Sequence, residues 1–206
     1  MLTTKNIVVK KHARVFSFGD LKTAKEVWLL FHGYGQNIPD FFKPFETFSK
    51  DKTFIIPEGL SRFYQKGILG KTGASWMTTQ DRDHEIIDQL NFLDTVYQQY
   101  ELKGKKVNVF AFSQGVQTAS RWIEKRKIEL NRIVLWSGNT PKLIAENPNN
   151  WFNSQVLEFY IGNKDQFVQN EKWEEFFKLK SYYKPTYYEG DHFFNSELLK
   201  KFIFNL

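Results

Sequence analysis

The chain has 206 residues and a formal net charge of +6, and hydrophobic residues make up 41% of it. A chain of this length supports one domain with a substantial core, and its 17% aromatic content argues against intrinsic disorder. Cysteine is absent, which excludes disulfides, thiolate zinc sites and cysteine nucleophiles.

The positive charge raises the possibility of a nucleic-acid partner. The basic clusters are short and scattered, however, at Lys10-Lys11, Lys103–Lys106 and Lys125–Lys127, and a nucleic-acid interface gathers its basic residues on one face. We therefore expect no nucleic-acid partner. The apolar runs are too short to cross a membrane, and residues 1–11 lack the apolar block of a secretory signal. We expect a cytoplasmic protein, and the oligomeric state stays open.

Short apolar runs alternate with longer amphipathic segments along the chain. In the first half we predict strands at Ile7–Lys10, Arg14–Phe18, Glu26–Phe31 and Thr53–Ile56. Residues 59–80 interrupt this rhythm with Gly59, Gly67, Gly70 and Gly73. A long loop inside a compact domain is often functional, and a packed surface loop is the alternative for this segment.

After this segment comes the best helix candidate, Asp81–Tyr100, whose apolar residues recur at steps of three and four. A strand at Lys106–Phe112 runs into Ser113, and a helix follows it. Further strands are predicted at Ile133–Trp136, Val156–Ile161 and Thr186–Glu189, and further helices at Glu171–Leu179 and Ser196–Phe204. This alternation predicts an α/β fold with a mostly parallel central sheet and helices on both faces.

The junction at Ser113 carries the strongest chemical signal. An apolar strand ends at the serine, a helix starts directly after it, and small residues, Ala111 and Gly115, lie two positions before and after it. That pattern is typical of a nucleophile elbow, a sharp turn that leaves no room for large side chains and exposes the serine hydroxyl. An ordinary turn with a capping serine is the alternative.

A serine nucleophile needs a base, and the base needs an orienting acid. After an elbow of this kind the acid and then the base follow along the chain. His192 is the only histidine after Ser113 and is the predicted base. Asp165 follows an apolar strand and is the predicted acid. Glu189 is its main rival, whereas Glu158 falls inside a strand and Glu146 lies in a polar Asn/Pro stretch.

The oxyanion of an acyl-transfer intermediate needs two converging backbone N–H groups. One is expected from Gln114, directly after the nucleophile. The other is expected from Tyr34, in the glycine-containing loop that follows the strand Glu26–Phe31. His32 in the same loop precedes the nucleophile, and we interpret it as a loop-fixing residue.

These residues resemble the α/β-hydrolase superfamily and, within it, the phospholipase/carboxylesterase family that includes the acyl-protein thioesterases. The similar blocks stand in family order: His32-Gly33-Tyr34-Gly35, Phe112-Ser113-Gln114-Gly115, Trp136-Ser137-Gly138, Gly162-Asn163-Lys164-Asp165 and Gly190-Asp191-His192. The sequence departs from the family pattern at Ala111, Tyr34 and Asp191. The resemblance implies a single α/β-hydrolase domain over residues 1–206 with a minimal cap domain or none.

The resemblance and the motifs together predict a serine hydrolase that cleaves carboxylic ester or thioester bonds through an acyl-enzyme, with no metal or cofactor. The expected partner is a small-molecule or acyl-chain ester. Phe63, Tyr64, Trp76 and Met77 are candidate walls for that substrate, and burial in the core is the alternative for each of them. A catalytically inactive hydrolase-fold binding protein, a lysophospholipase and a peptidase stay open as other functions.

Overall fold

The structure, a computed structural model, describes residues 1–48, 50, 52–139, 156–168, 170–179 and 183–204. Its centre is a seven-stranded sheet with the order β1-β3-β2-β6-β7-β8-β9, in which β1 is antiparallel to β3 and the other neighbours are parallel. The strands are β1 (Val15–Phe18), β2 (Glu26–Phe31), β3 (Lys52–Pro57), β6 (Val107–Phe112), β7 (Arg132–Trp136), β8 (Leu157–Gly162) and β9 (Thr186–Tyr188). This is the mostly parallel sheet that the sequence predicted.

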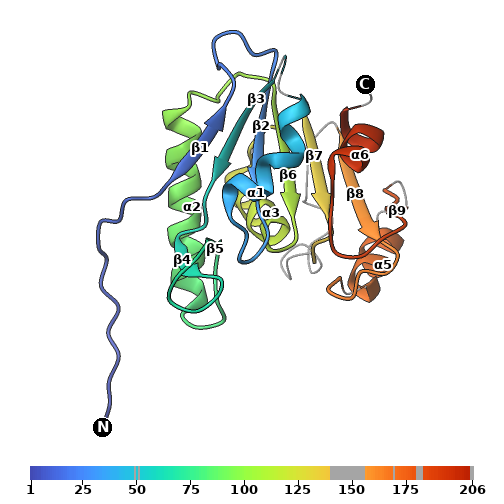
Figure 1. The fold of residues 1–206 in the computed structure, drawn as a ribbon. Coiled ribbons are helices and arrows are strands. Elements are labelled where there is room, and N and C mark those ends of the chain that lie inside the picture. The colour runs from blue at the N-terminus through green and yellow to red at the C-terminus, as the bar shows by residue number, and fades with distance from the viewer. Residues whose placement is uncertain (49, 51, 140–155, 169, 180–182, 205–206) are drawn as a thin grey trace.

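Helices cover both faces of this sheet (Figure 1). One face packs against α2 (Arg82–Gln99), α3 (Gln114–Arg126) and α5 (Asn170–Leu179), and its core includes Leu93, Trp122 and Phe159. The other face packs against α1 (Ile38–Phe42), the 3-10 turn η1 (Lys43–Phe48), α6 (Ser196–Leu199) and the π turn η3 (Lys200–Phe204). Because both faces are covered, the central strands β2, β6 and β7 are mostly apolar on both faces rather than alternating.

Two predictions from the first half of the chain are corrected by the structure. Ile7–Lys10 is not a strand: the segment before β1 runs away from the sheet (Figure 1), and Ile7, Val8 and Val9 are 74%, 99% and 71% exposed. The apolar run therefore has no partner strand. The segment 59–80 is not a simple loop, because it contains the antiparallel hairpin of β4 (Ser61–Tyr64) and β5 (Thr72–Ser75).

The parallel strands bring the polar ends of the predicted motifs to one edge of the sheet. His32, Ser113, Ser137 and Asn163 directly follow β2, β6, β7 and β8. In open α/β sheets this carboxyl edge is where sites form. In the described ranges, no helix combines the length and the apolarity needed to cross a bilayer.

Candidate active site

Ser113 stands on a strained turn between β6 and α3. Its φ and ψ are 54° and −120°, a backbone conformation that few residues other than glycine adopt. The Ser113 N–H donates to the carbonyl of Trp136 at 3.0 Å, which holds the turn against β7. A Cβ on Gly115 would lie 2.5 Å from the carbonyl oxygen of Phe31, so only glycine fits there. The local geometry is that of the predicted elbow.

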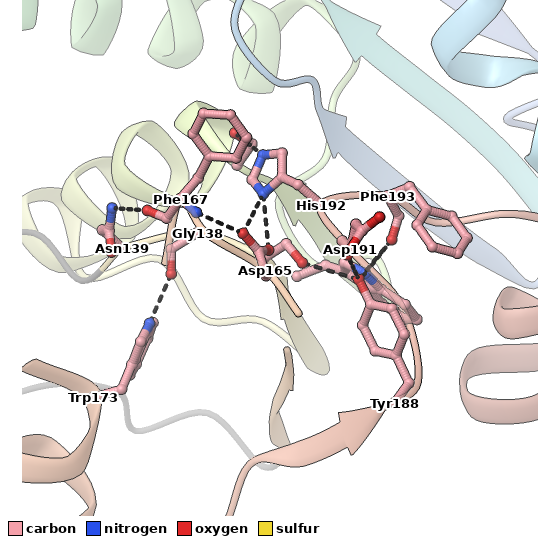
Figure 2. A network of polar contacts seen from close by, with 12 residues as sticks. Gly138, Asn139, Asp165, Phe167, Trp173, Tyr188, Asp191, His192 and Phe193 are labelled. Atoms are coloured by element: carbon pink, nitrogen blue, oxygen red, sulfur yellow. Dashed lines mark hydrogen bonds and ion pairs between the residues drawn. The ribbon is translucent and has the colours of Figure 1, made fainter. Parts of the chain in front are cut away.

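The structure brings the three predicted catalytic side chains together, and Figure 2 shows His192 beside Asp165. His192 Nε2 lies 2.7 Å from Ser113 Oγ, and His192 Nδ1 lies 2.8 Å and 3.0 Å from the two carboxylate oxygens of Asp165. The Asp165 side chain is fully buried and that of His192 is 20% exposed. A carboxylate accepts only, so Nδ1 carries the proton and Nε2 accepts from the serine hydroxyl.

The rival acids lie elsewhere. The Glu189 side chain is 84% exposed and pairs with Lys164 at 3.6 Å. Glu158 binds Arg132 through both of its oxygens, at 2.5 Å and 2.8 Å. Position 146 lies outside the described residues. Within the part of the chain that the structure describes, Asp165 is the carboxylate that meets His192.

The loops that carry Asp165 and His192 are joined by main-chain hydrogen bonds. The Asn163 N–H donates to the carbonyl of Tyr188 at 3.0 Å, and the Lys164 N–H donates to that of Gly190 at 3.0 Å. A Cβ on Gly162 would lie 2.5 Å from the carbonyl oxygens of both Gly190 and Asp191. The glycine at the end of β8 therefore allows the two loops to approach closely.

Tyr188 supports the loop that carries His192, a role that the sequence analysis missed (Figure 2). Its buried hydroxyl lies 2.6 Å and 3.0 Å from the carbonyl oxygens of Phe193 and Asp191, the two residues that flank His192. Trp136 Nε1 donates to the same hydroxyl at 3.0 Å and to the Phe193 carbonyl at 3.1 Å. Burial raises the pKa of Tyr188, so its hydroxyl keeps its proton. Tyr188 belongs to no recognisable sequence motif, so the sequence alone could not identify this role.

The other side of the site is the loop after β2, which we call the oxyanion loop (residues 32–36). The Gly33 N–H donates to Gln36 Oε1 at 2.6 Å, and the Gly35 N–H donates to the carbonyl of Ala74 at 2.8 Å. A Cβ on Gly33 would lie 3.1 Å from the Cβ of Ser113, so this backbone passes directly beside the nucleophile.

The main-chain N–H groups of Tyr34 and Gln114 are the two predicted oxyanion donors. Among the described residues, neither the main-chain N–H of Tyr34 nor that of Gln114 has a hydrogen-bond acceptor. The Gln114 side chain accepts from the Trp76 N–H at 3.0 Å and donates to the carbonyl of Met77 at 2.8 Å. It therefore joins the start of α3 to the end of the hairpin.

His32 has the contacts of a loop-fixing residue. It is fully buried and stacks on Trp76 with ring centroids 4.9 Å apart. Its Nε2 accepts from the Gly59 N–H at 2.9 Å, which leaves Nδ1 to donate to the carbonyl of Gly33 at 2.7 Å. Burial lowers the pKa of His32 to about 4, so this imidazole is neutral at physiological pH.

The four predicted substrate walls separate into two groups. The Phe63 ring is half-buried, with its centroid 5.4 Å from that of Tyr34, and Tyr64 is 52% exposed. Trp76 and Met77 are only 1% and 6% exposed, and the Trp76 indole donates to the carbonyl of His32. Their burial favours the alternative of core packing for these two: Trp76 stacks on His32, and Met77 Sδ lies 3.7 Å from Arg121 Nη1.

Solved structures with the same architecture come from proteins of low sequence identity. One is the esterase PE8, with a TM-score of 0.68 and 18% identity over 92% of this chain and 95% of that one. A phospholipase/carboxylesterase from Dyadobacter fermentans DSM 18053 has a TM-score of 0.68 and 15% identity over 97% of this chain and 100% of its own. Acyl-protein thioesterase 2 from Zea mays has a TM-score of 0.64 and 19% identity, over 92% and 96% of the two chains.

No family model matches the sequence, and no curated protein sequence matches it. At identities this low the similarity establishes the fold alone. The chain has an α/β-hydrolase fold, with a mostly parallel central sheet between two layers of helices. The resemblance that the sequence motifs indicated is thus confirmed at the level of the fold.

Proposed function

We propose that the protein is a serine hydrolase that cleaves carboxylic ester or thioester bonds through an acyl-enzyme. The observation that carries the proposal is the unbroken chain of contacts from Ser113 Oγ to His192 Nε2, at 2.7 Å, and from His192 Nδ1 to Asp165, at 2.8 Å. A hydroxyl at hydrogen-bond distance from an imidazole that a buried carboxylate orients is the arrangement that activates a serine nucleophile.

In the acylation half of the reaction, Ser113 Oγ attacks the substrate carbonyl carbon while His192 Nε2 takes the hydroxyl proton. Asp165 stabilises the imidazolium that forms. The carbonyl oxygen becomes an oxyanion, for which the N–H groups of Tyr34 and Gln114 are the proposed donors. When the intermediate collapses, the bond from carbon to the alcohol oxygen or thiol sulfur breaks, and His192 gives its proton to the leaving group.

In the deacylation half, water replaces the alcohol or thiol. His192 takes a proton from the water, whose oxygen attacks the acyl carbon, and the same two N–H groups hold the second oxyanion. Collapse breaks the bond to Ser113 Oγ, which recovers its proton from His192, and the carboxylic acid is released. Solved structures with this fold include proteins named as esterases and a thioesterase, which supports a reaction of this class.

The proposal is tested with a matched pair of serine variants on α3 and its turn. Ser113→Ala removes the proposed nucleophile, whereas Ser120→Ala removes a buried hydroxyl that has no hydrogen-bond partner among the described residues. With p-nitrophenyl butyrate, we expect Ser113→Ala to lose at least ~10⁴ in kcat and Ser120→Ala to keep its rate. Circular dichroism and thermal unfolding establish that both variants fold.

A covalent label gives an independent readout. A fluorophosphonate probe should add to Ser113 in the wild type and to no residue in Ser113→Ala, with the adduct located by mass spectrometry. A folded wild type that neither hydrolyses the ester nor takes the label contradicts the proposal. That result supports the inactive hydrolase-fold binding protein instead.

A further inference from the structure

The imidazole of His192 lies between two phenyl rings that differ sharply in exposure. The Phe112 ring centroid is 5.0 Å from that of His192, and Phe112 is only 5% exposed. On the outer side the Phe167 ring centroid is 4.8 Å from the imidazole, yet Phe167 is 70% exposed (Figure 2). Phe112 belongs to the packed core, whereas Phe167 presents most of its ring to solvent beside the proposed base.

The main chain holds Phe167 in this position. Its N–H donates to Asp165 Oδ1 at 2.9 Å, and its carbonyl accepts from Asn139 Nδ2 at 3.0 Å (Figure 2). The first bond ties the phenylalanine to the acid itself, and the second ties it to the loop that follows β7. Since both main-chain polar groups are bonded, the backbone of Phe167 is held beside the site, and the exposed face of its ring is available to a bound molecule.

The chemistry of the site determines which part of a substrate meets this ring. His192 Nε2 must give a proton to the departing oxygen or sulfur, so that atom comes within about 3 Å of Nε2. The carbon group attached to that atom therefore departs from beside the imidazole. Phe167 is the exposed apolar side chain in contact with this imidazole, with ring centroids 4.8 Å apart.

We propose that Phe167 forms a leaving-group subsite that favours esters or thioesters of uncharged apolar alcohols or thiols, aromatic or alkyl. The inference rests on the proposed function and specifies its substrate class. An exposed phenyl ring supplies apolar area and an aromatic face but no hydrogen bond, so it selects for apolar surface in the leaving group. Covering about 50 Å² of the ring favours binding by about tenfold.

The experiment compares esters of one acid with different alcohols. Ethyl, hexyl and benzyl butyrate form the same acyl-enzyme, and their alcohols have similar acidities, so differences in kcat/KM report contacts of the leaving group during acylation. We expect the wild type to prefer benzyl and hexyl butyrate over ethyl butyrate by about tenfold. Butyrate release is followed by titration at constant pH.

Phe167→Ala should lower the ratio of kcat/KM for benzyl and ethyl butyrate about tenfold, toward one. Phe167→Leu keeps apolar area without the aromatic face, and its ratio should fall less. Phe18 is a matched control, 45% exposed on β1, whose antiparallel direction places it at the opposite edge of the sheet. Phe18→Ala should leave the ratio unchanged.

Three results would overturn the subsite. A wild type that takes the fluorophosphonate label but shows no preference among the three esters contradicts the subsite alone. So does a Phe167→Ala variant that loses the same factor on ethyl and benzyl butyrate, because that result means the ring only shields His192. A wild type that hydrolyses no ester and takes no label contradicts the proposed function as well.

Discussion

The two halves of the carboxyl edge are built differently. In the half that holds Asp165 and His192, a phenolic hydroxyl and an indole N–H fix the loop carbonyls, and the ionisable groups face one another. In the half that holds the oxyanion loop, the amide side chains of Gln36 and Gln114 fix the backbone. In the proposed function, the first half moves a proton and the second half supplies main-chain N–H groups.

The two histidines show what the difference means. His192 keeps 20% of its side chain exposed and faces the carboxylate of Asp165, and its other nitrogen faces Ser113 Oγ. His32 is fully buried with both nitrogens bonded to the main chain, and its pKa is lowered to about 4. A histidine is thus the proposed acid–base catalyst in one half, and in the other half a neutral histidine holds the main chain by hydrogen bonds.

After the loss of the nucleophile itself, the largest effect is expected from a change to the acid in the first half. Asp165→Asn keeps the shape of the side chain but places a neutral amide against His192 Nδ1. The amide stabilises no imidazolium and also favours the wrong tautomer when its NH₂ faces Nδ1. We expect kcat to fall by about 10³–10⁴ with p-nitrophenyl butyrate, measured as initial rates.

Glu189→Gln is the matched control for Asp165→Asn, because Glu189 is the rival acid and its side chain is 84% exposed. We expect its rate to stay within about twofold of the wild type, since an exposed charge so placed is strongly screened. A large loss in Glu189→Gln together with a small loss in Asp165→Asn would reverse the assignment of the acid.

A smaller effect is expected in the second half. Gln36→Leu removes the oxygen that accepts from the Gly33 N–H at 2.6 Å and so loosens the oxyanion loop. No donor is lost outright, and the expected decrease in kcat is therefore about 10–100-fold, below the cost of deleting an oxyanion donor. The change should act on kcat more than on KM, because the oxyanion forms only in the transition state. A purely raised KM would contradict this role.

Much of this edge could be predicted from the sequence. Buried parallel strands such as β2 and β6 are continuous apolar runs, and their bounds matched closely for that reason. Ser113 was found from the strand–turn–helix pattern, His192 is the only histidine after it, and Asp165 follows an apolar strand between the two. Their meeting in the structure requires the sheet to place those strand ends at one edge, which the alternation of elements already implied.

The rest depends on contacts that leave no local pattern. Tyr188 and Gln36 support the site through hydrogen bonds to the main chain. Any tyrosine or glutamine could make such bonds, so the sequence did not single these two out. The burial of Trp76 depends on its packing against Phe31 of β2. A contact between segments so far apart in the chain could not be read from the sequence around Trp76. Ile7–Lys10 has the composition of a strand, yet strand formation also needs a neighbouring edge.

The buried His32 of the second half should make the free energy of unfolding depend on pH. His32 titrates near 6.5 when unfolded and about 4 when folded, so at about pH 5 the unfolded state binds more protons. This contribution is present above the unfolded pKa and is lost as the pH falls toward 4. From about pH 7.5 to pH 5, His32 should cost about 2 kcal/mol of unfolding free energy.

Urea unfolding of the wild type and His32→Gln at both pH values measures this contribution as a difference between the two proteins. The variant is expected to be less stable at neutral pH, because it loses the hydrogen bonds of His32 to the Gly33 carbonyl and the Gly59 N–H. Its stability should nevertheless fall less on acidification. Parallel losses in the two proteins would mean that His32 does not carry the pH dependence.

The smallest effect is expected at the clamp behind His192. Tyr188→Phe keeps the ring but removes the hydroxyl that reaches the carbonyls of Asp191 and Phe193. Trp136 Nε1 still donates to the Phe193 carbonyl at 3.1 Å, so the loop keeps that bond and kcat should fall only about fivefold, or ~1 kcal/mol. KM should stay nearly constant, because Tyr188 acts on the position of the base rather than on substrate binding.

Tyr187→Phe is the control, since Tyr187 is 53% exposed and its hydroxyl has no hydrogen bond among the described residues. Equal losses in the two variants would remove Tyr188 from the apparatus that positions His192.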